Sequence, residues 1–196
     1  MRIRQAEHVF DAPWDLVVRA QFRKYPNEFN NAVEGVDVVE RRVDKTGTLY
    51  SHRLLSTRWG LPGWATKIIG SNGLGYGSEH SEVNARTKTM EMKTRNLTFC
   101  NIITVDEKMT YRPHPEDKNK TVLHQESVVN VQGVPLSSYI EHYVIDNIAT
   151  NAEKGKKAMV SVMEKIQKES LELQHGAQKT MEEAFQKLHF NERSPF

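Results

Sequence analysis

The sequence predicts an α+β domain in which a curved antiparallel β-sheet is covered on one face by a long C-terminal α-helix. Several segments of about ten residues alternate apolar and polar side chains, which is typical of strands with one buried face. One longer segment, beginning near residue 138, repeats apolar side chains at helical spacing. With 196 residues and 38% hydrophobic content, the chain can bury a sizeable core. We therefore expect one domain over residues 1–168 and a tail over residues 169–196.

The chain should open with a strand and a short helix. Residues 2–10 are expected to form the strand. Asp11 is a candidate N-cap for the helix, and Pro13 fits its first turn because proline is tolerated there. The expected core-facing residues recur at helical spacing: Trp14, Val17, Val18, Phe22 and Tyr25. Pro26 cannot continue a helix, so the helix should end before it.

The remaining strands should follow one another as an antiparallel meander. They are expected at residues 35–38, 48–57, 74–83, 87–98, 99–112 and 120–131. Asp44–Gly47 supplies a turn between the first two of these strands. Further along, Met90 and Met92 alternate with Glu91 and Lys93. This alternation suits a sheet that is covered on one face only.

A long helix should supply that cover. Ser138-Tyr-Ile-Glu141 has the spacing of a capping box, which marks a helix start. The apolar side chains that follow share one helical face: Ile140, Val144, Ile148, Ala152, Met159, Val162 and Ile166. We expect this helix to cross the concave face of the sheet. Gly176 should separate a terminal piece, which is expected to be an amphipathic helix or a disordered tail.

Residues 58–70 combine two tryptophans and three branched aliphatic residues with three glycines and a proline. Proline lacks a backbone donor and glycine weakens regular structure, so this segment is predicted to be an apolar loop. Two interpretations stay open. The loop packs on the protein's own core, or it is a lid over an apolar cavity that enters a bilayer interface. The residues assigned to the lid and to membrane contact are Arg58, Trp59, Leu61, Pro62, Trp64, Lys67, Ile68 and Ile69.

Composition and motifs argue against several classes of protein. A formal net charge of +2, without a run of basic residues, argues against nucleic acid binding. Cys100 is the single cysteine, which excludes an intramolecular disulfide and a cysteine-based zinc site. The sequence has no His-x-x-x-His pair, no Gly-x-Ser-x-Gly elbow and no phosphate-binding glycine loop. We therefore expect a non-enzymatic protein without a metal or a cofactor.

Membrane contact, if any, should be peripheral. The first ten residues have neither the apolar core of a secretory signal nor the acid-free amphipathic pattern of a transit peptide. No apolar run approaches the roughly 20 residues that span a bilayer. A lid or another surface segment would therefore have to make the contact.

Two lysines are candidate binding residues. Lys154 lies on the covering helix, and a cation directed into an apolar cavity costs several kcal/mol unless an anion answers it. The alternative for Lys154 is a lysine on the solvated face of that helix. Lys24 lies at the end of the first helix, where a favourable interaction with the helix dipole is the alternative to ligand binding.

Several motifs together resemble the PRELI domain family, from residue 1 to about residue 168. They are His8-Val-Phe with Trp14, Lys24-Tyr-Pro-Asn27, Gly35-Val-Asp37, Arg53-Leu-Leu-Ser-Thr57 running into Trp59-Gly-Leu-Pro62, Thr94-Arg-Asn96 and Asn151-Ala-Glu-Lys-Gly155. Four segments are most similar to the Slowmo branch of that family: Val36-Asp-Val, Ser51–Thr57, Tyr111-Arg-Pro-His-Pro115 and Pro135-Leu-Ser-Ser-Tyr139.

The resemblance implies a helix-grip fold, with a curved antiparallel sheet closed by the C-terminal helix around a lipid cavity. It implies a carrier of single phospholipids across the mitochondrial intermembrane space, working with a small helical-hairpin partner that bears twin Cys-x9-Cys motifs. By the same resemblance, Lys24, Asn151 and Lys154 are the headgroup residues.

Two departures bear on the substrate that the resemblance implies. Where phosphatidic acid carriers of the family have a histidine and a lysine, this chain has Ala32 and Thr57. The favoured substrate is therefore phosphatidylserine. The alternatives are a phosphatidic acid carrier of the same fold, an adaptor that binds only protein, and a hydrolase of the same shape.

Overall fold

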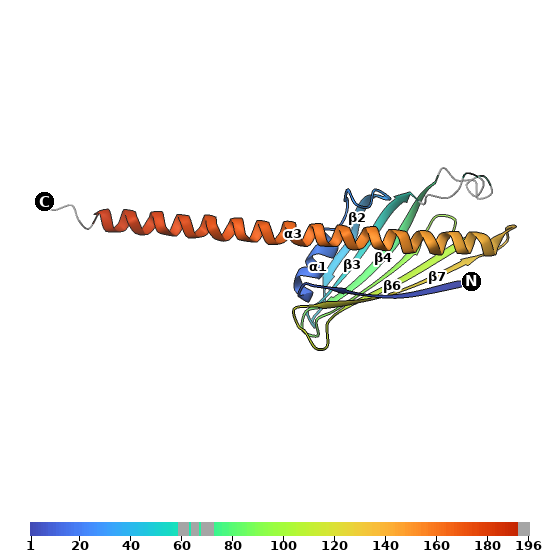
Figure 1. Ribbon diagram of the computed structural model, residues 1–196, viewed down its shortest axis with the longest axis horizontal. Helices are drawn as coiled ribbons and strands as arrows, with labels where there is room; N and C mark the ends of the chain where they lie inside the picture. Colours follow the sequence, from blue (N-terminus) through green and yellow to red (C-terminus); the bar gives the residue numbers. More distant parts are fainter. Residues whose placement is uncertain (59–62, 64–66, 68–72, 192–196) are drawn as a thin grey trace.

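The computed structural model describes residues 1–58, 63, 67 and 73–191 (Figure 1). Its described residues form a seven-stranded antiparallel sheet, with a helix near the N-terminus and a long C-terminal helix. The strands are β1 (Arg2–Phe10), β2 (Val33–Val43), β3 (Thr48–Arg58), β4 (Leu74–Asn84), β5 (Thr89–Asn96), β6 (Ile103–Pro113) and β7 (Thr121–Val131). The sheet order is β1-β7-β6-β5-β4-β3-β2, so β2 to β7 form a meander and β1 pairs with β7. The predicted helix-grip architecture is confirmed.

Most strands lie close to their predicted positions, but β2 extends over Val33–Val43 where we expected residues 35–38, and β5 and β6 also differ from the prediction. We expected strands over residues 87–98 and 99–112 with nothing between them. Instead β5 ends at Asn96 and β6 begins at Ile103, and residues 97–102 form the connection. The single cysteine, Cys100, lies in this connection and is exposed.

The short helix α1 (Trp14–Phe22) follows β1 as predicted, but its N-cap differs from the prediction. Pro13 is the N-cap, and the described residues provide no side-chain cap. Asp11 is two residues earlier, and a capping carboxylate acts from the N-cap position itself. The Pro13 carbonyl instead accepts hydrogen bonds from the backbone N–H groups of Leu16 (3.0 Å) and Val17 (3.2 Å).

The long helix α3 (Ser137–Asn191) crosses the concave face of the sheet (Figure 1). Of its predicted inward positions, Ile140, Val144, Met159, Val162 and Ile166 are buried, and Ile148 and Ala152 are half-buried and line the cavity. The predicted capping box does not form. The Glu141 carboxylate lies beside β7 and β1, where it accepts the Val131 N–H (3.0 Å) and pairs with the Met1 ammonium (2.6 Å). This carboxylate therefore fixes the start of α3 to the edge of the sheet.

The helix continues well beyond the sheet. We predicted a separation at Gly176, but α3 runs through that residue without interruption (Figure 1). From residue 167 to residue 185, every side chain is exposed. Within the described ranges, no helix is both long enough and apolar enough to cross a membrane.

The core consists of two apolar clusters. One joins α1, the inner face of the sheet and the middle of α3, and contains Trp14, Val17, Met90, Tyr111, Met159 and Ile166. The other lies under the first turns of α3 and contains Ile103, Val129, Val131, Ile140, Val144 and Ile145. Because the clusters occupy opposite ends of the concave face, the space between them is available for a site.

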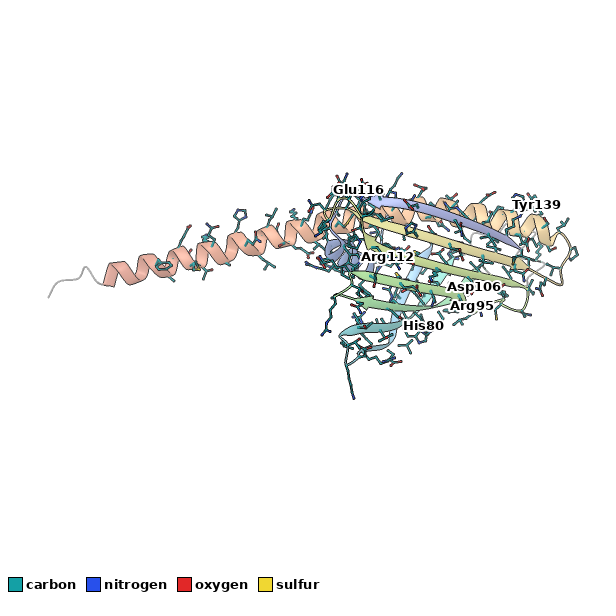
Figure 2. All side chains as sticks on the ribbon, turned by 90° about the horizontal axis from the view of Figure 1, so that it is seen from below. His80, Arg95, Asp106, Arg112, Glu116 and Tyr139 are labelled. Carbon is teal, nitrogen blue, oxygen red and sulfur yellow. The ribbon has the colours of Figure 1, made fainter. Side chains whose placement is uncertain are left out.

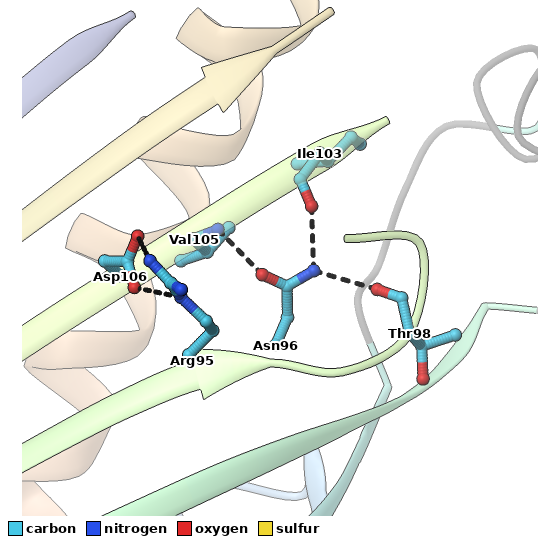
Figure 3. Close-up of polar contacts among 6 residues, drawn as sticks. All are labelled: Arg95, Asn96, Thr98, Ile103, Val105 and Asp106. Atoms are coloured by element: carbon cyan, nitrogen blue, oxygen red, sulfur yellow. Dashed lines mark hydrogen bonds and ion pairs between the residues drawn. The ribbon is translucent and has the colours of Figure 1, made fainter. Parts of the chain in front are cut away.

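Asn96 fixes the connection between β5 and β6 (Figure 3). Its side-chain amide donates to the carbonyls of Thr98 (2.8 Å) and Ile103 (2.8 Å), and its oxygen accepts the Val105 N–H (2.7 Å). The side chain is only 6% exposed, so these backbone groups have little access to water. The neighbouring Arg95 forms a pair with Asp106 on the opposite, exposed face.

We predict that Asn96→Ala lowers the free energy of unfolding by about 3 kcal/mol, because it leaves buried backbone groups without hydrogen bonds. The control is Arg95→Ala, which removes an exposed ion pair and should cost less than about 1 kcal/mol. Urea denaturation followed by circular dichroism measures both values. Equal losses in the two variants would contradict this role for Asn96.

Candidate functional site

A cavity of about 280 Å³ lies between the concave face of the sheet and α3. Its walls come mostly from strands β3 to β7, with one residue each from β1 and β2, from the middle of α3, and from α1 with the segment that follows it. Apolar side chains of both core clusters line it, among them Val105, Met109, Leu123, Val144 and Met159. Polar side chains interrupt this apolar lining. The chemistry of this lining suits a ligand with an apolar part and one polar end.

The strand register places polar residues in one row across the concave face. From β3 to β7, the paired residues are Arg53, Glu79, Thr94, Glu107 and Ser127. Paired residues point to the same face of a sheet, so all five side chains are directed toward α3. Glu79, Thr94 and Glu107 line the cavity itself.

Arg53 and Glu79 neutralise each other within this row. The Arg53 Nε–H donates to the Glu79 carboxylate at 2.7 Å, and both side chains are 5% exposed. The Arg53 guanidinium also lies over the Phe22 ring, 5.4 Å from its centroid. A buried charge is tolerated when it is paired and hydrogen-bonded, so this pair can remain in place without a ligand.

Lys24 is a buried cation that borders the cavity. Its exposed fraction is 7%, and its Nζ lies 4.8 Å from the centroid of the Tyr25 ring. The same nitrogen is close to α3, because a Cβ added at Gly155 would lie 4.0 Å from it. In the part of the chain that the structure describes, Lys24 forms no ion pair. An anionic ligand group would provide the missing counter-charge.

Glu107 is another charged residue that lines the cavity, and like Lys24 it forms no ion pair among the described residues. Burial raises the pKa of the Glu107 carboxyl, and the Lys24 charge and the Gln125 amide partly offset this effect. The residue nevertheless keeps some accessible surface, because its side chain lines the cavity. The phenol of Tyr111 lies nearby; burial raises its pKa above the ordinary value, and the Glu107 charge adds to that shift.

The predicted headgroup residues do not all meet at the cavity. Lys24 and Asn151 line it, but Lys154 is exposed and does not. The prediction that Lys154 faces the cavity is therefore wrong. The inward face of α3 passes through Asn151, Ala152, Gly155, Lys156 and Met159, and a helix turns about 100° per residue, so Lys154 lies to one side. Lys156 lines the cavity instead, and its ammonium already pairs with Glu153 at 2.7 Å.

The predicted lid lies mostly outside the described residues. These are Trp59, Leu61, Pro62, Trp64, Ile68 and Ile69. Of the remaining lid residues, Lys67 is exposed, and Arg58 borders the cavity and pairs with Glu34. The Arg58 backbone N–H also donates to the Ala32 carbonyl at 2.7 Å. The residue that precedes the predicted lid therefore lies at the cavity.

Two substitutions noted in the sequence also lie at this part of the cavity. Ala32 and Thr57 both line the cavity, next to Arg58. The Thr57 hydroxyl donates to the Gly75 carbonyl at 3.4 Å. Neither side chain carries a charge, so this part of the wall is less cationic than it would be with histidine and lysine at these positions.

Sequence reasoning missed three charged residues of the concave face: Arg53, Glu79 and Glu107. A signal for them was present, since Arg53 is two residues from the inward Leu55, and Glu107 is two residues from the inward Met109. The opposite face of the sheet contains a different set of charges. Figure 2 views the sheet from that side, where His80, Arg95 and Asp106 point away from α3.

Comparison with solved structures agrees with the fold. The Zhui aromatase/cyclase from Streptomyces sp. R1128 aligns with a TM-score of 0.57 at 16% identity, covering 83% of this chain and 94% of that one. A START superfamily protein from Mycobacterium smegmatis aligns with a TM-score of 0.53 at 12% identity, covering 81% and 97%. At such low identity the similarity concerns the fold alone.

Sequence comparison finds nearer relatives. The UPS-like protein C36.10 of Schizosaccharomyces pombe is 38% identical over 85% of this chain and 91% of its own length. The mitochondrial protein UPS2 of Saccharomyces cerevisiae is 34% identical over 84% and 73%, and a slowmo homologue of Dictyostelium discoideum is 31% identical over 91% and 83%. The profile of the PRELI-like family matches residues 15–170. The chain therefore belongs to the PRELI-like family.

Proposed function

We propose that this protein is a non-enzymatic carrier that transfers single phospholipids, with phosphatidylserine as its substrate. The observation that carries the proposal is the buried ammonium of Lys24, which borders an apolar cavity and has no ion-pair partner in the described residues. A phospholipid matches both features, because its phosphate can pair with the Lys24 ammonium and its acyl chains can contact the apolar lining. Membership of the PRELI-like family and the START-like fold support this role.

The choice of phosphatidylserine rests on charge. The phosphate monoester of phosphatidic acid approaches two negative charges near neutral pH, whereas phosphatidylserine carries about one net negative charge. A site for the monoester should therefore gather more cations. Ala32 and Thr57 supply none, and the Arg53 and Lys156 cations are already paired with Glu79 and Glu153. Lys24 and the neutral Asn151 amide are then the headgroup donors that we propose.

The proposed setting is the mitochondrial intermembrane space, between the outer and inner membranes. The UPS2 relative is a mitochondrial protein, which supports this location.

A small helical-hairpin protein with twin Cys-x9-Cys motifs is the proposed partner, and it would supply disulfides that a chain with one cysteine cannot form within itself. Co-expression should raise the melting temperature, and an equal value with and without that protein would contradict the pairing.

Replacing Lys24 by Met should reduce phosphatidylserine transfer between liposomes at least about tenfold, because a buried phosphate without its cation costs roughly 2 to 5 kcal/mol. The matched control is Lys154→Met on the exposed side of α3, which should transfer at the wild-type rate. Mixed donor liposomes test the headgroup in the same assay. Undiminished transfer by Lys24→Met would refute the site, and preferential transfer of phosphatidic acid would refute the substrate.

The lid remains a prediction from the sequence. Its apolar side chains could bury enough area for several kcal/mol of interfacial binding at about 25 cal/mol per Å². Trp64→Ala combined with Ile68→Ala should therefore slow transfer and leave the melting temperature unchanged. Leu171→Ala with Leu173→Ala, which removes exposed apolar area from the distal part of α3, is the control. A wild-type transfer rate in the Trp64/Ile68 variant would rule out membrane engagement by this segment.

A further inference from the structure

A lysine and a glutamate, Lys24 and Glu107, face the same cavity. Among the described residues, neither Lys24 nor Glu107 forms an ion pair, with each other or with another side chain. They are nevertheless close enough for the Lys24 charge to lower the pKa of Glu107. The other charged pair of the row, Arg53 and Glu79, is complete in itself. The cavity therefore presents one available cation and one available carboxylate.

The ionised form of Glu107 is costly in this position unless a cation reaches it, which is why burial raises the pKa of its carboxyl. Its neighbours on the inner face of β6 are Val105, Met109 and Tyr111, so the carboxylate lies in an otherwise apolar strand face. An ionised carboxylate in such surroundings loses much of its hydration. The Gln125 amide favours the ionised form but brings no charge. The side chain also retains accessible surface toward the cavity, so a ligand can approach it.

We propose that Glu107 is the acceptor for the primary ammonium group of an aminophospholipid, while Lys24 holds the phosphate of the same molecule. The inference rests on the proposed phospholipid carrier and deepens it. In ethanolamine and serine headgroups, a short linker separates a phosphate from an ammonium, which matches a cation and a carboxylate that share a cavity without touching. An ammonium has three N–H donors, and the Glu107 carboxylate accepts charge-assisted hydrogen bonds from them. Thr94, beside Glu107 in the row, adds a hydroxyl.

This assignment gives the carrier a basis for selection that a cationic pocket alone does not provide. Phosphatidic acid and phosphatidylethanol can satisfy Lys24, but they leave the Glu107 carboxylate buried without a cation. Sites that require a polar partner reject analogues lacking it strongly, because their own polar groups are then left unpaired. Phosphatidylserine and phosphatidylethanolamine should therefore share one mode of binding.

The test compares phosphatidylethanolamine with phosphatidylethanol, which has the same phosphate diester and lacks only the ammonium. Both lipids are placed in equal amounts in donor liposomes, and their transfer to acceptor liposomes is measured by mass spectrometry. The wild-type protein should prefer phosphatidylethanolamine by about tenfold or more. Glu107→Gln keeps the shape of the side chain and removes its charge, so the preference should fall to about one. Glu82→Gln, on the exposed face of β4, is the matched control and should keep the wild-type preference.

The outcomes separate this inference from the proposed function. Phosphatidylserine is included in the same donor liposomes, and no transfer of any of the three lipids by the wild-type protein would refute the carrier itself. Transfer of phosphatidylserine alone would refute the shared binding mode and leave the carrier standing. Transfer of phosphatidylethanolamine and phosphatidylethanol at equal rates by the wild-type protein would refute the role of Glu107 and leave the carrier standing. An unchanged preference in folded Glu107→Gln would refute it as well. If that variant does not fold, as judged by circular dichroism, the wild-type comparison decides the question alone.

Discussion

A charge in an apolar interior needs an opposite charge, and this constraint governs the inner face of the sheet. The row from Arg53 to Ser127 crosses every strand from β3 to β7, with apolar side chains on either side of it. Arg53 and Glu79 form an ion pair within the row. Lys24 and Glu107 do not, and this difference divides the polar groups into a structural pair and a candidate binding pair.

The rest of the fold holds these groups in position. The antiparallel register places Glu107 opposite Thr94 of β5. Asn96 connects the adjacent end of β5 to β6 through its side-chain hydrogen bonds. Lys24 reaches the cavity from the end of α1, which is itself fixed by buried Trp14 and Val17. On the opposite side, Gly155 leaves room on α3 beside the Lys24 ammonium. Sheet, short helix and long helix thus each contribute one wall of the same site.

Most of the fold could be predicted from the sequence, because alternation and helical spacing directly reflect which face of an element is buried. The apolar stripe of α3 and the strand segments were found this way. Local details were not, since they depend on tertiary partners. Glu141 accepts the Val131 N–H and does not form the predicted capping box. Asn96 bonds to the following connection, so β5 ends earlier than its side-chain pattern indicated.

The candidate site could be predicted only in part. Lys24, Asn151 and Lys154 were all identified through motifs, but a motif does not give the helical phase, and on a helix a shift of one residue changes the face by about 100°. Applying the phase of Ala152 and Met159 strictly would have favoured Lys156. Glu107 was missed because a charged residue interrupts the apolar alternation of β6, although its spacing from Met109 directs it inward.

The central claim is that the cavity holds one intact phospholipid. Native mass spectrometry of the protein, purified together with its bound lipids and then extracted for lipid analysis, tests it most directly. We expect a complex of one chain with one phospholipid whose mass and fragments match phosphatidylserine. A protein that carries no lipid, or one that holds a hydrolysed product, would contradict it.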